Sequence, residues 1–192
     1  MGRLSAVLLG AMGCGSNPDT RSCPGPYPPQ SASAYVLPWN IGEAYVVGQG
    51  NCGSSSHAAG TIVQYAYDVL MPIGTPVLAA RSGTVFLVEE RFVDGTRRPG
   101  EENYINVLHQ DGTLAGYVHF TQSGALVAVG DAVVQGQMIG LSGDTGSSTE
   151  PHLHFHVQGC SGCATVPVTF RNTRPHPSGL VVGETYRAEP FE

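Results

Sequence analysis

The segment from Pro151 to Val157 constrains the fold more than any other part of the sequence. Imidazole and apolar side chains alternate strictly along His-Leu-His-Phe-His-Val, and successive side chains of a β-strand point to opposite faces. The pattern therefore predicts a strand with one apolar face for a core and one face that carries three imidazoles. Histidine is the commonest metal ligand and titrates near neutral pH, so this face suits a metal site or an acid–base site. A solvated row of surface histidines is the alternative.

Distance limits how many of these imidazoles can act together. His152 and His156 would lie about 13 Å apart at roughly 3.3 Å per residue, so one ion would not easily take both. We therefore expect two of the three histidines to share a site and the third to be peripheral.

The rest of the chain favours an antiparallel all-β domain. Of the 192 residues, 26 are glycine and 14 are proline, which favour tight turns, and no segment keeps a 3.6-residue period. A glycine- and serine-rich loop is expected at residues 48–60. Strands are expected at residues 35–37, 44–47, 62–70, 77–80, 84–90, 104–109, 114–120, 152–157, 166–170 and 183–186.

Charge excludes several classes of protein. The formal net charge is −6 with nine basic residues, all of them arginine, so a nucleic-acid partner is not expected because phosphate contacts need a basic face. The absence of lysine excludes Schiff-base chemistry and a Walker-type phosphate loop. It also excludes a lipoyl-type carrier domain, which the valine and glycine rhythm around residues 129–140 would otherwise suggest.

The N-terminus has the features of an export signal. Residues 1–14 combine Arg3 with a short apolar run that ends in small residues and Cys14. Residues 11–14 resemble a bacterial lipoprotein cleavage site, which implies lipidation of Cys14, and an ordinary secretory signal is the alternative. Gly15 and Ser16 follow Cys14, with no aspartate beside the cysteine. By resemblance to Gram-negative lipoproteins this implies an outer-membrane anchor facing the periplasm; otherwise the protein is periplasmic or secreted. Residues 15–34 are expected to be a flexible tether rich in proline, serine and glycine, and residues 35–192 the folded domain.

The four remaining cysteines suit disulfides in an oxidising compartment. Three pairings are possible, and the spacing favours Cys23 with Cys52 and Cys160 with Cys163. A four-cysteine zinc site is the competing interpretation.

Three further residues complete the group of candidates. His119 lies in a second alternating stretch, Tyr117–Phe120, His57 lies in the glycine-rich loop, and Asp68 lies within the apolar run 62–70. A carboxylate in an apolar strand is costly unless it is paired or metal-bound. The alternative role for Asp68 is to cap the following turn. Two histidines and a carboxylate with an open fourth position are a standard composition for catalytic zinc.

Several segments together resemble the lysostaphin/LytM-type zinc metallopeptidases, in the order found in that family. The resemblance runs from about residue 45 to residue 158 and implies an antiparallel LytM-like β domain with little helix. The matching stretches are Tyr65–Asp68 with 71–85, 106–112 with Tyr117–Phe120, 130–140, and 142–155.

The resemblance also implies roles for the candidate residues. It implies that Asp68 and His154 bind one Zn²⁺ per chain, and that His119 and His152 are catalytic. It implies a zinc-dependent endopeptidase that hydrolyses peptide bonds in the stems or cross-bridges of bacterial peptidoglycan. The alternative is a degenerate domain that binds the cell wall or activates another hydrolase without catalysis. The implied partners are peptidoglycan and, through the lipid anchor, a membrane; a regulatory protein partner is left open.

The first metal ligand departs from the commonest family pattern. That pattern has a histidine four residues before the aspartate, where this chain has Gln64. Some members place the ligand in an upstream Ser-His element, which implies His57, eleven residues before Asp68. The three histidines that match no catalytic position are expected to be structural or exposed: His109, His156 and His176.

Overall fold

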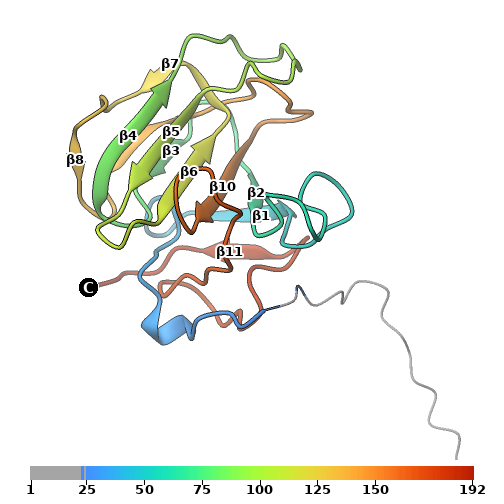
Figure 1. Cartoon of the computed structure of the whole chain (residues 1–192), viewed down its shortest axis with the longest axis vertical. Helices are drawn as coiled ribbons and strands as arrows, with labels where there is room; N and C mark the ends of the chain where they lie inside the picture. The colour runs from blue at the N-terminus through green and yellow to red at the C-terminus, as the bar shows by residue number, and fades with distance from the viewer. Residues whose placement is uncertain (1–22, 24) are drawn as a thin grey trace, which may run out of the picture.

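The computed structural model describes Cys23 and residues 25–192 (Figure 1). The expected export signal over residues 1–14, the lipidation of Cys14 and the first part of the expected tether lie outside the described residues. Within the described part of the chain, no helix has the length and apolar character needed to cross a membrane.

Two antiparallel sheets form the domain (Figure 1). The larger sheet has eight strands in the order β11-β1-β2-β10-β6-β5-β4-β8, and the smaller has the order β3-β9-β7. In the described residues the one helix is the three-residue 3-10 turn η1 (Gln30–Ala32). The expected all-β antiparallel fold is therefore confirmed. The strands are β1 (Ala44–Gln49), β2 (Tyr67–Leu70), β3 (Pro76–Leu78), β4 (Gly83–Glu89), β5 (Tyr104–Leu108), β6 (Leu114–Val118), β7 (Phe120–Ala125), β8 (Ala132–Val133), β9 (Met138–Ser142), β10 (His152–Gln158) and β11 (Thr185–Arg187).

The hydrophobic core contains residues of both sheets. Leu153, Phe155 and Val157 of β10 are each at most 1% exposed and belong to this core. The predicted two-faced strand is thus confirmed, because the apolar face of β10 is buried and its histidines lie on the other face. Burial of large apolar side chains stabilises the strand by about 1.5–3 kcal/mol each.

The strand register places polar residues next to one another on that other face. Asp68 of β2 pairs directly with His154 of β10 on one side and with Gln49 of β1 on the other. On the far side of β10, His156 pairs with Gly116 of β6. Directly opposed residues of an antiparallel pair have Cβ atoms about 4.5–5.5 Å apart, so these side chains can touch.

Two segments predicted as strands are buried without joining a sheet. Residues 35–37 and 166–170 contain no strand. Leu37 N–H donates to Asn172 Oδ1 at 2.7 Å, and Phe170 N–H donates to His176 Nε2 at 2.9 Å. The apolar runs correctly indicated burial, but side chains rather than a neighbouring strand satisfy much of the backbone.

The predicted strand 62–70 begins five residues late, at Tyr67. Residues 58–66 instead form successive turns, with Thr61 N–H donating to Ala58 O at 3.0 Å and Ala66 N–H to Val63 O at 3.0 Å. Gly60 N–H also donates to the Gln64 side chain at 2.8 Å. The β-branched residues at 62 and 63 favour a strand locally, but the closing hydrogen bonds of these turns outweigh that preference.

The second half of the expected tether packs against the domain. Gln30 Nε2 donates to Thr173 O at 2.7 Å, and the Tyr27 hydroxyl accepts from Asn51 Nδ2 at 2.7 Å. Ser33 is 6% exposed. Residues 25–34 therefore differ from the free tether expected from their composition, because their few polar and aromatic side chains find long-range partners.

Two disulfides connect the four described cysteines. Cys23 is bonded to Cys52 and Cys160 to Cys163, which is the pairing that the spacing favoured. The competing four-cysteine zinc site is not formed by these residues.

Candidate metal centre

Three potential ligand atoms converge on the polar face of the large sheet. His154 Nδ1 lies 2.8 Å from Asp68 Oδ1, His57 Nε2 lies 3.3 Å from the same oxygen, and the two histidine nitrogens are 3.2 Å apart. With metal–ligand bonds of about 2.0–2.2 Å, tetrahedral zinc places its ligand atoms roughly 3.3 Å from one another. In the described residues, these three are the group of His, Cys, Asp or Glu side chains that could hold a metal ion.

Two of these residues are placed by the sheet and one by a loop. Asp68 and His154 are opposed in the β2–β10 ladder, so their backbones fix the separation of their side chains. His57 comes from the irregular segment between β1 and β2, and its side chain is completely buried. A donor set of two histidines and one carboxylate leaves a fourth position open, as catalytic zinc sites do.

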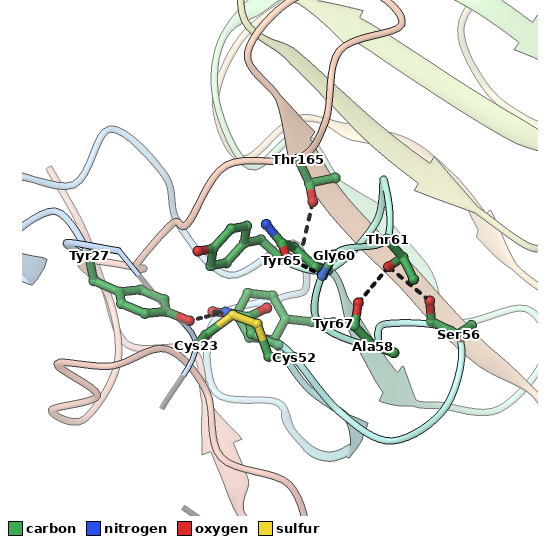
Figure 2. The surroundings of a disulfide bond; sticks show 12 residues. Cys23, Tyr27, Cys52, Ser56, Ala58, Gly60, Thr61, Tyr65, Tyr67 and Thr165 are labelled. Atoms are coloured by element: carbon green, nitrogen blue, oxygen red, sulfur yellow. Dashed lines mark hydrogen bonds between the residues drawn. A yellow bond between two sulfur atoms is a disulfide. The ribbon is translucent and has the colours of Figure 1, made fainter. Parts of the chain in front are cut away.

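Turns and one disulfide hold the segment that carries His57 (Figure 2). The Cys23–Cys52 disulfide fixes its start, and Cys52 N–H donates to Gln64 O at 2.7 Å. Thr61 Oγ1 donates to the carbonyl oxygen of Ala58 at 2.8 Å. At the far end, Tyr65 N–H donates to Thr165 Oγ1 at 3.0 Å. Each end of the loop is therefore attached to a different part of the fold.

The electrostatics of the group favour an ionised carboxylate. Burial by itself would raise the pKa of Asp68, but hydrogen bonds from His154 and His57 outweigh it and hold that pKa well below its usual range. Burial also lowers the pKa of His154, against the opposing effect of Asp68. At neutral pH Asp68 is therefore ionised and the His154 imidazole is neutral, and a divalent cation requires both states of such ligands.

Gln49 completes the surroundings of the carboxylate. Its Nε2 donates to Asp68 Oδ2 at 2.6 Å and to Ser56 Oγ at 2.9 Å. Asp68 Oδ1 is then the oxygen that faces His57 and His154. Ser56 precedes His57 in the chain, so Gln49 connects the sheet to the loop.

His152 and His119 lie beside the group with defined orientations. His152 Nδ1 lies 2.8 Å from Glu150 O and His119 Nδ1 lies 2.6 Å from Thr145 O. A carbonyl oxygen only accepts, so each Nδ1 carries a proton, and in the neutral ring Nε2 then keeps a free lone pair. The two rings are 4.5 Å apart between centroids, and His152 Nε2 is 3.7 Å from Asp68 Oδ1.

His119 stands where the chain passes from one sheet to the other. The sequence predicted one strand over 114–120, but β6 ends at Val118 and β7 begins at Phe120. His119 between them has φ 70°, in the left-handed region that non-glycine residues rarely adopt. Burial, followed by the neighbouring His152, lowers its pKa to about 4.

Buried polar side chains fix the two carbonyls and the backbone around these histidines. Asn103 is completely buried, its carbonyl oxygen accepts from His119 N–H at 2.8 Å, and its backbone N–H donates to Thr145 Oγ1 at 3.0 Å. Ser148 Oγ lies 3.2 Å from His152 Nδ1 and donates to Asp144 Oδ1 at 2.6 Å. These contacts attach the loop 143–150 to the backbone at Asn103 and to His152.

The three histidines without an expected catalytic role have different surroundings. His109 and His176 are 3% and 2% exposed, and both bind backbone atoms of neighbouring loops. They are structural, as expected. His156 is half-buried, and its Nδ1 lies 3.0 Å from His154 Nε2.

A cleft of about 380 Å³ borders Asp68 and His152. Its walls carry few large side chains, and Glu150 adds a second carboxylate. The rest of the lining consists of Gly48, Gln49, Gly50, Gly53, Ser54, Ser55, Leu70, Thr149 and Val182. A larger hollow of about 700 Å³, between the ends of β4, β5 and β8, contains none of the site residues described above.

The sequence indicated all five site residues, but not what orients them. Gln49, Asn103 and Ser148 have no motif that marks them, and Gln49 reaches Asp68 only because of the register of β1 on β2. No sequence signal marks Asn103, which lies between Glu102 and Tyr104 directly before β5.

Comparison with known proteins identifies the family. The sequence profile described as "Peptidase family M23" matches residues 55–167, which is more than half of the chain. The chain belongs to peptidase family M23. The matched range of this M23 domain includes all five site residues, from the His57 loop to β10, and the recognition from sequence motifs is thereby confirmed.

Relatives of the M23 domain include lysostaphin and a peptidoglycan endopeptidase. It is 44% identical over 94 residues to lysostaphin of Staphylococcus simulans, which is 48% of this chain and 17% of lysostaphin. It is 38% identical over 90 residues to the peptidoglycan DD-endopeptidase ShyA of Vibrio cholerae, which is 47% of this chain and 19% of ShyA. The matched part thus spans less than a fifth of the length of either relative.

Solved structures agree on the fold. The deep-sea M23 metalloprotease pseudoalterin matches 82% of this chain and 96% of its own with a TM-score of 0.54 at 18% identity. The catalytic domain of EnpA from Enterococcus faecalis, as its A109H mutant, matches 68% and 94% with a TM-score of 0.52 at 24% identity. At these identities the likeness is one of fold.

Proposed function

We propose that this M23 domain is a zinc-dependent endopeptidase that hydrolyses peptide bonds in the stems or cross-bridges of bacterial peptidoglycan. One observation carries the proposal: His57 Nε2, Asp68 Oδ1 and His154 Nδ1 meet within tetrahedral ligand spacing beside two further imidazoles. Membership of peptidase family M23 supports a metal at this position, and the relative ShyA, a peptidoglycan DD-endopeptidase, supports the substrate class.

The donor set fits zinc better than calcium or magnesium. Two imidazole nitrogens and one carboxylate oxygen suit Zn²⁺, whereas the two hard cations prefer sites made of oxygen. His57, Asp68 and His154 would hold the ion. When bound, zinc polarises a carbonyl oxygen and makes water a competent nucleophile near neutral pH.

The chain's own contribution to catalysis comes from His119 and His152. In their neutral forms both present an unprotonated Nε2, because the one ring proton is on Nδ1 and is donated to the carbonyl oxygens of Thr145 and Glu150. Either nitrogen can accept a proton from water, and the imidazolium so formed can donate it to the leaving amine. An imidazolium at this position would also stabilise the negative charge that develops on the scissile carbonyl oxygen.

The cell-wall location is part of the proposal. Two disulfides in the described residues suit an oxidising compartment outside the cytoplasm. The export signal over residues 1–14 and a lipid anchor at Cys14 remain predictions from sequence, and they would bring the domain to the wall.

The test is the release of cross-link fragments from purified peptidoglycan, analysed by chromatography. The wild-type domain should release soluble peptides, and removal of metal by a chelator should stop the reaction until Zn²⁺ is added back. His109→Leu is the matched control, because His109 is buried and lies outside the group of ligands. Undiminished release by His154→Ala would rule out the proposed centre.

The second candidate is a non-catalytic domain that binds the wall or activates another hydrolase. It predicts a folded protein that binds peptidoglycan without cleaving it. The retention of all five site residues in one place favours the enzyme over this candidate, and elemental analysis separates the two, since an enzyme should contain about one zinc per chain.

A further inference from the structure

His154 uses both of its ring nitrogens. Nδ1 faces Asp68 Oδ1 at 2.8 Å and His57 Nε2 at 3.2 Å. Nε2 lies 3.0 Å from Nδ1 of His156, the next residue on the same face of β10. The ring is therefore held from two sides, by the potential ligands on one side and by a second imidazole on the other.

The sheet makes a specific place for the His156 ring. His156 is opposed to Gly116 in β6, and a Cβ atom at position 116 would lie 2.5 Å from both Cε1 and Nε2 of the ring. Real Cβ atoms do not approach so closely, so the glycine allows the ring to lie directly over the backbone of β6. Glycine is needed at position 116 because it lacks a side chain. Its backbone conformation does not require glycine, since its φ is not positive.

The direction of the hydrogen bond between the two imidazoles follows from the number of donor and acceptor nitrogens on each ring. A neutral imidazole has one donor and one acceptor nitrogen. If the Nδ1 lone pair of His154 is directed at a metal, the proton of that ring must be on Nε2. Nδ1 of His156 must then be the acceptor, with the His156 proton on its own Nε2.

The other histidine ligand lacks such a partner. His57 Nδ1 is buried and has no hydrogen-bond partner among the described residues. Histidines that bind metals almost always donate their second N–H to an acceptor, which fixes the ring and raises its basicity. Of the two imidazoles in the proposed centre, His154 is thus the one whose orientation a partner side chain defines.

We propose that His156 is a positioning residue for the metal centre: its Nδ1 accepts from His154 Nε2–H and so fixes the ring that presents Nδ1 to the ion. The proposal rests on the metal centre proposed above. It gives a function to the third histidine of the strand, which the sequence alone indicated as peripheral.

Metal affinity measured without substrate tests this directly. Purified apo-protein is titrated with Co²⁺, and the d–d absorption reports the ligand geometry; competition with a chromophoric chelator gives the Zn²⁺ dissociation constant. His156→Leu should weaken Zn²⁺ binding by about ten- to hundredfold and alter the Co²⁺ spectrum. His156→Asn, whose side-chain oxygen can accept near the position of Nδ1, should stay within about threefold of wild type.

A second pair of variants separates positioning from folding. Gly116→Ala should displace the His156 ring and weaken Zn²⁺ binding, and the combination with His156→Leu should add little, because both changes remove the same hydrogen bond. Thermal melts of the apo-proteins monitor folding, and His109→Leu is the control for loss of a buried histidine far from the centre. Wild-type affinity in His156→Leu overturns the inference, and failure of the wild-type protein to bind zinc overturns the proposed function instead.

Discussion

The two halves of the proposed metal centre are held by different kinds of structure. Asp68 and His154 lie on the neighbouring strands β2 and β10, where the backbone ladder sets their separation. His57 lies on the irregular segment 50–66, where turns, side-chain hydrogen bonds and the Cys23–Cys52 disulfide set its position. We call these the sheet half and the loop half. A sheet can therefore fix two of three ligands through its backbone ladder. The third ligand depends on hydrogen bonds and a disulfide between segments that are distant in the chain.

The largest effect is expected when one ligand is removed from either half. His154→Ala and His57→Ala should both lower peptidoglycan hydrolysis by at least about a thousandfold, because the activation of water depends on the bound ion. Metal affinity should separate them: His57→Ala keeps two ligands on the rigid sheet and should bind Zn²⁺ more tightly than His154→Ala. Isothermal titration of the apo-proteins measures this, and equal affinities would mean that the loop half is as well preformed as the sheet half.

The second test loosens the loop half alone. The Cys23–Cys52 disulfide closes a segment with a sequence separation of 29, for which loop entropy gives up to about 3–4 kcal/mol of stability. The double variant Cys23→Ser with Cys52→Ser should therefore lower the melting temperature and weaken Zn²⁺ binding.

The other disulfide supplies the matched control for this test. Cys160 and Cys163 are separated by only three positions, so Cys160→Ser with Cys163→Ser should lose only about half as much stability. Equal loss of Zn²⁺ affinity in both double variants would show that the Cys23–Cys52 disulfide has no specific role in placing His57.

The third test uses pH on the metal-free protein. The pKa of His119 is lowered to about 4 by burial, against about 6.5 in an unfolded chain. Below pH 6.5 the unfolded chain binds a proton that the folded protein resists, so the free energy of unfolding should fall between pH 6.5 and 4.

The expected loss is of the order of 1–3 kcal/mol for this group, and urea unfolding at pH 7 and pH 4.5 measures it. In His119→Asn the pH dependence should be shallower over the same window. An equally steep dependence in that variant would show that other groups are responsible.

The smallest expected effect comes from the contact between the halves. Gln49 donates to Asp68 in the sheet half and to Ser56 in the loop half. Gln49→Leu should weaken Zn²⁺ binding by about tenfold, as is typical for residues that orient a ligand. Gln110→Leu, an exposed glutamine in the turn between β5 and β6, should have no effect. An equal loss of Zn²⁺ affinity in Gln110→Leu would show that Gln49 has no specific role in orienting Asp68.

The same division explains what the sequence could predict. Strict alternation identified β10 and its histidines, and a carboxylate in an apolar run identified Asp68, because strand periodicity is a local property. That Asp68 meets His154 depends on the register of two strands 86 residues apart, which no local pattern determines. Family motifs supplied that pairing, together with His119, His152 and His57 as site residues.

Residues that satisfy buried backbone escaped prediction for a related reason. Asn103 and Asn172 hold carbonyl and amide groups of segments distant in the chain. The same contacts turned the expected strand at 35–37 into irregular structure. Local propensity indicates which residues are buried, whereas the identity of their hydrogen-bond partners is fixed only when the whole domain is assembled.

The backbone at His119 has a consequence for how this protein could evolve. A left-handed conformation strains a histidine by roughly 1 kcal/mol or more, whereas asparagine and especially glycine adopt it with little strain. Folding and chemistry therefore favour different amino acids at the same codon. A library randomised at position 119 and sorted only for heat resistance should accumulate asparagine and glycine, and the same library sorted for wall lysis should return histidine.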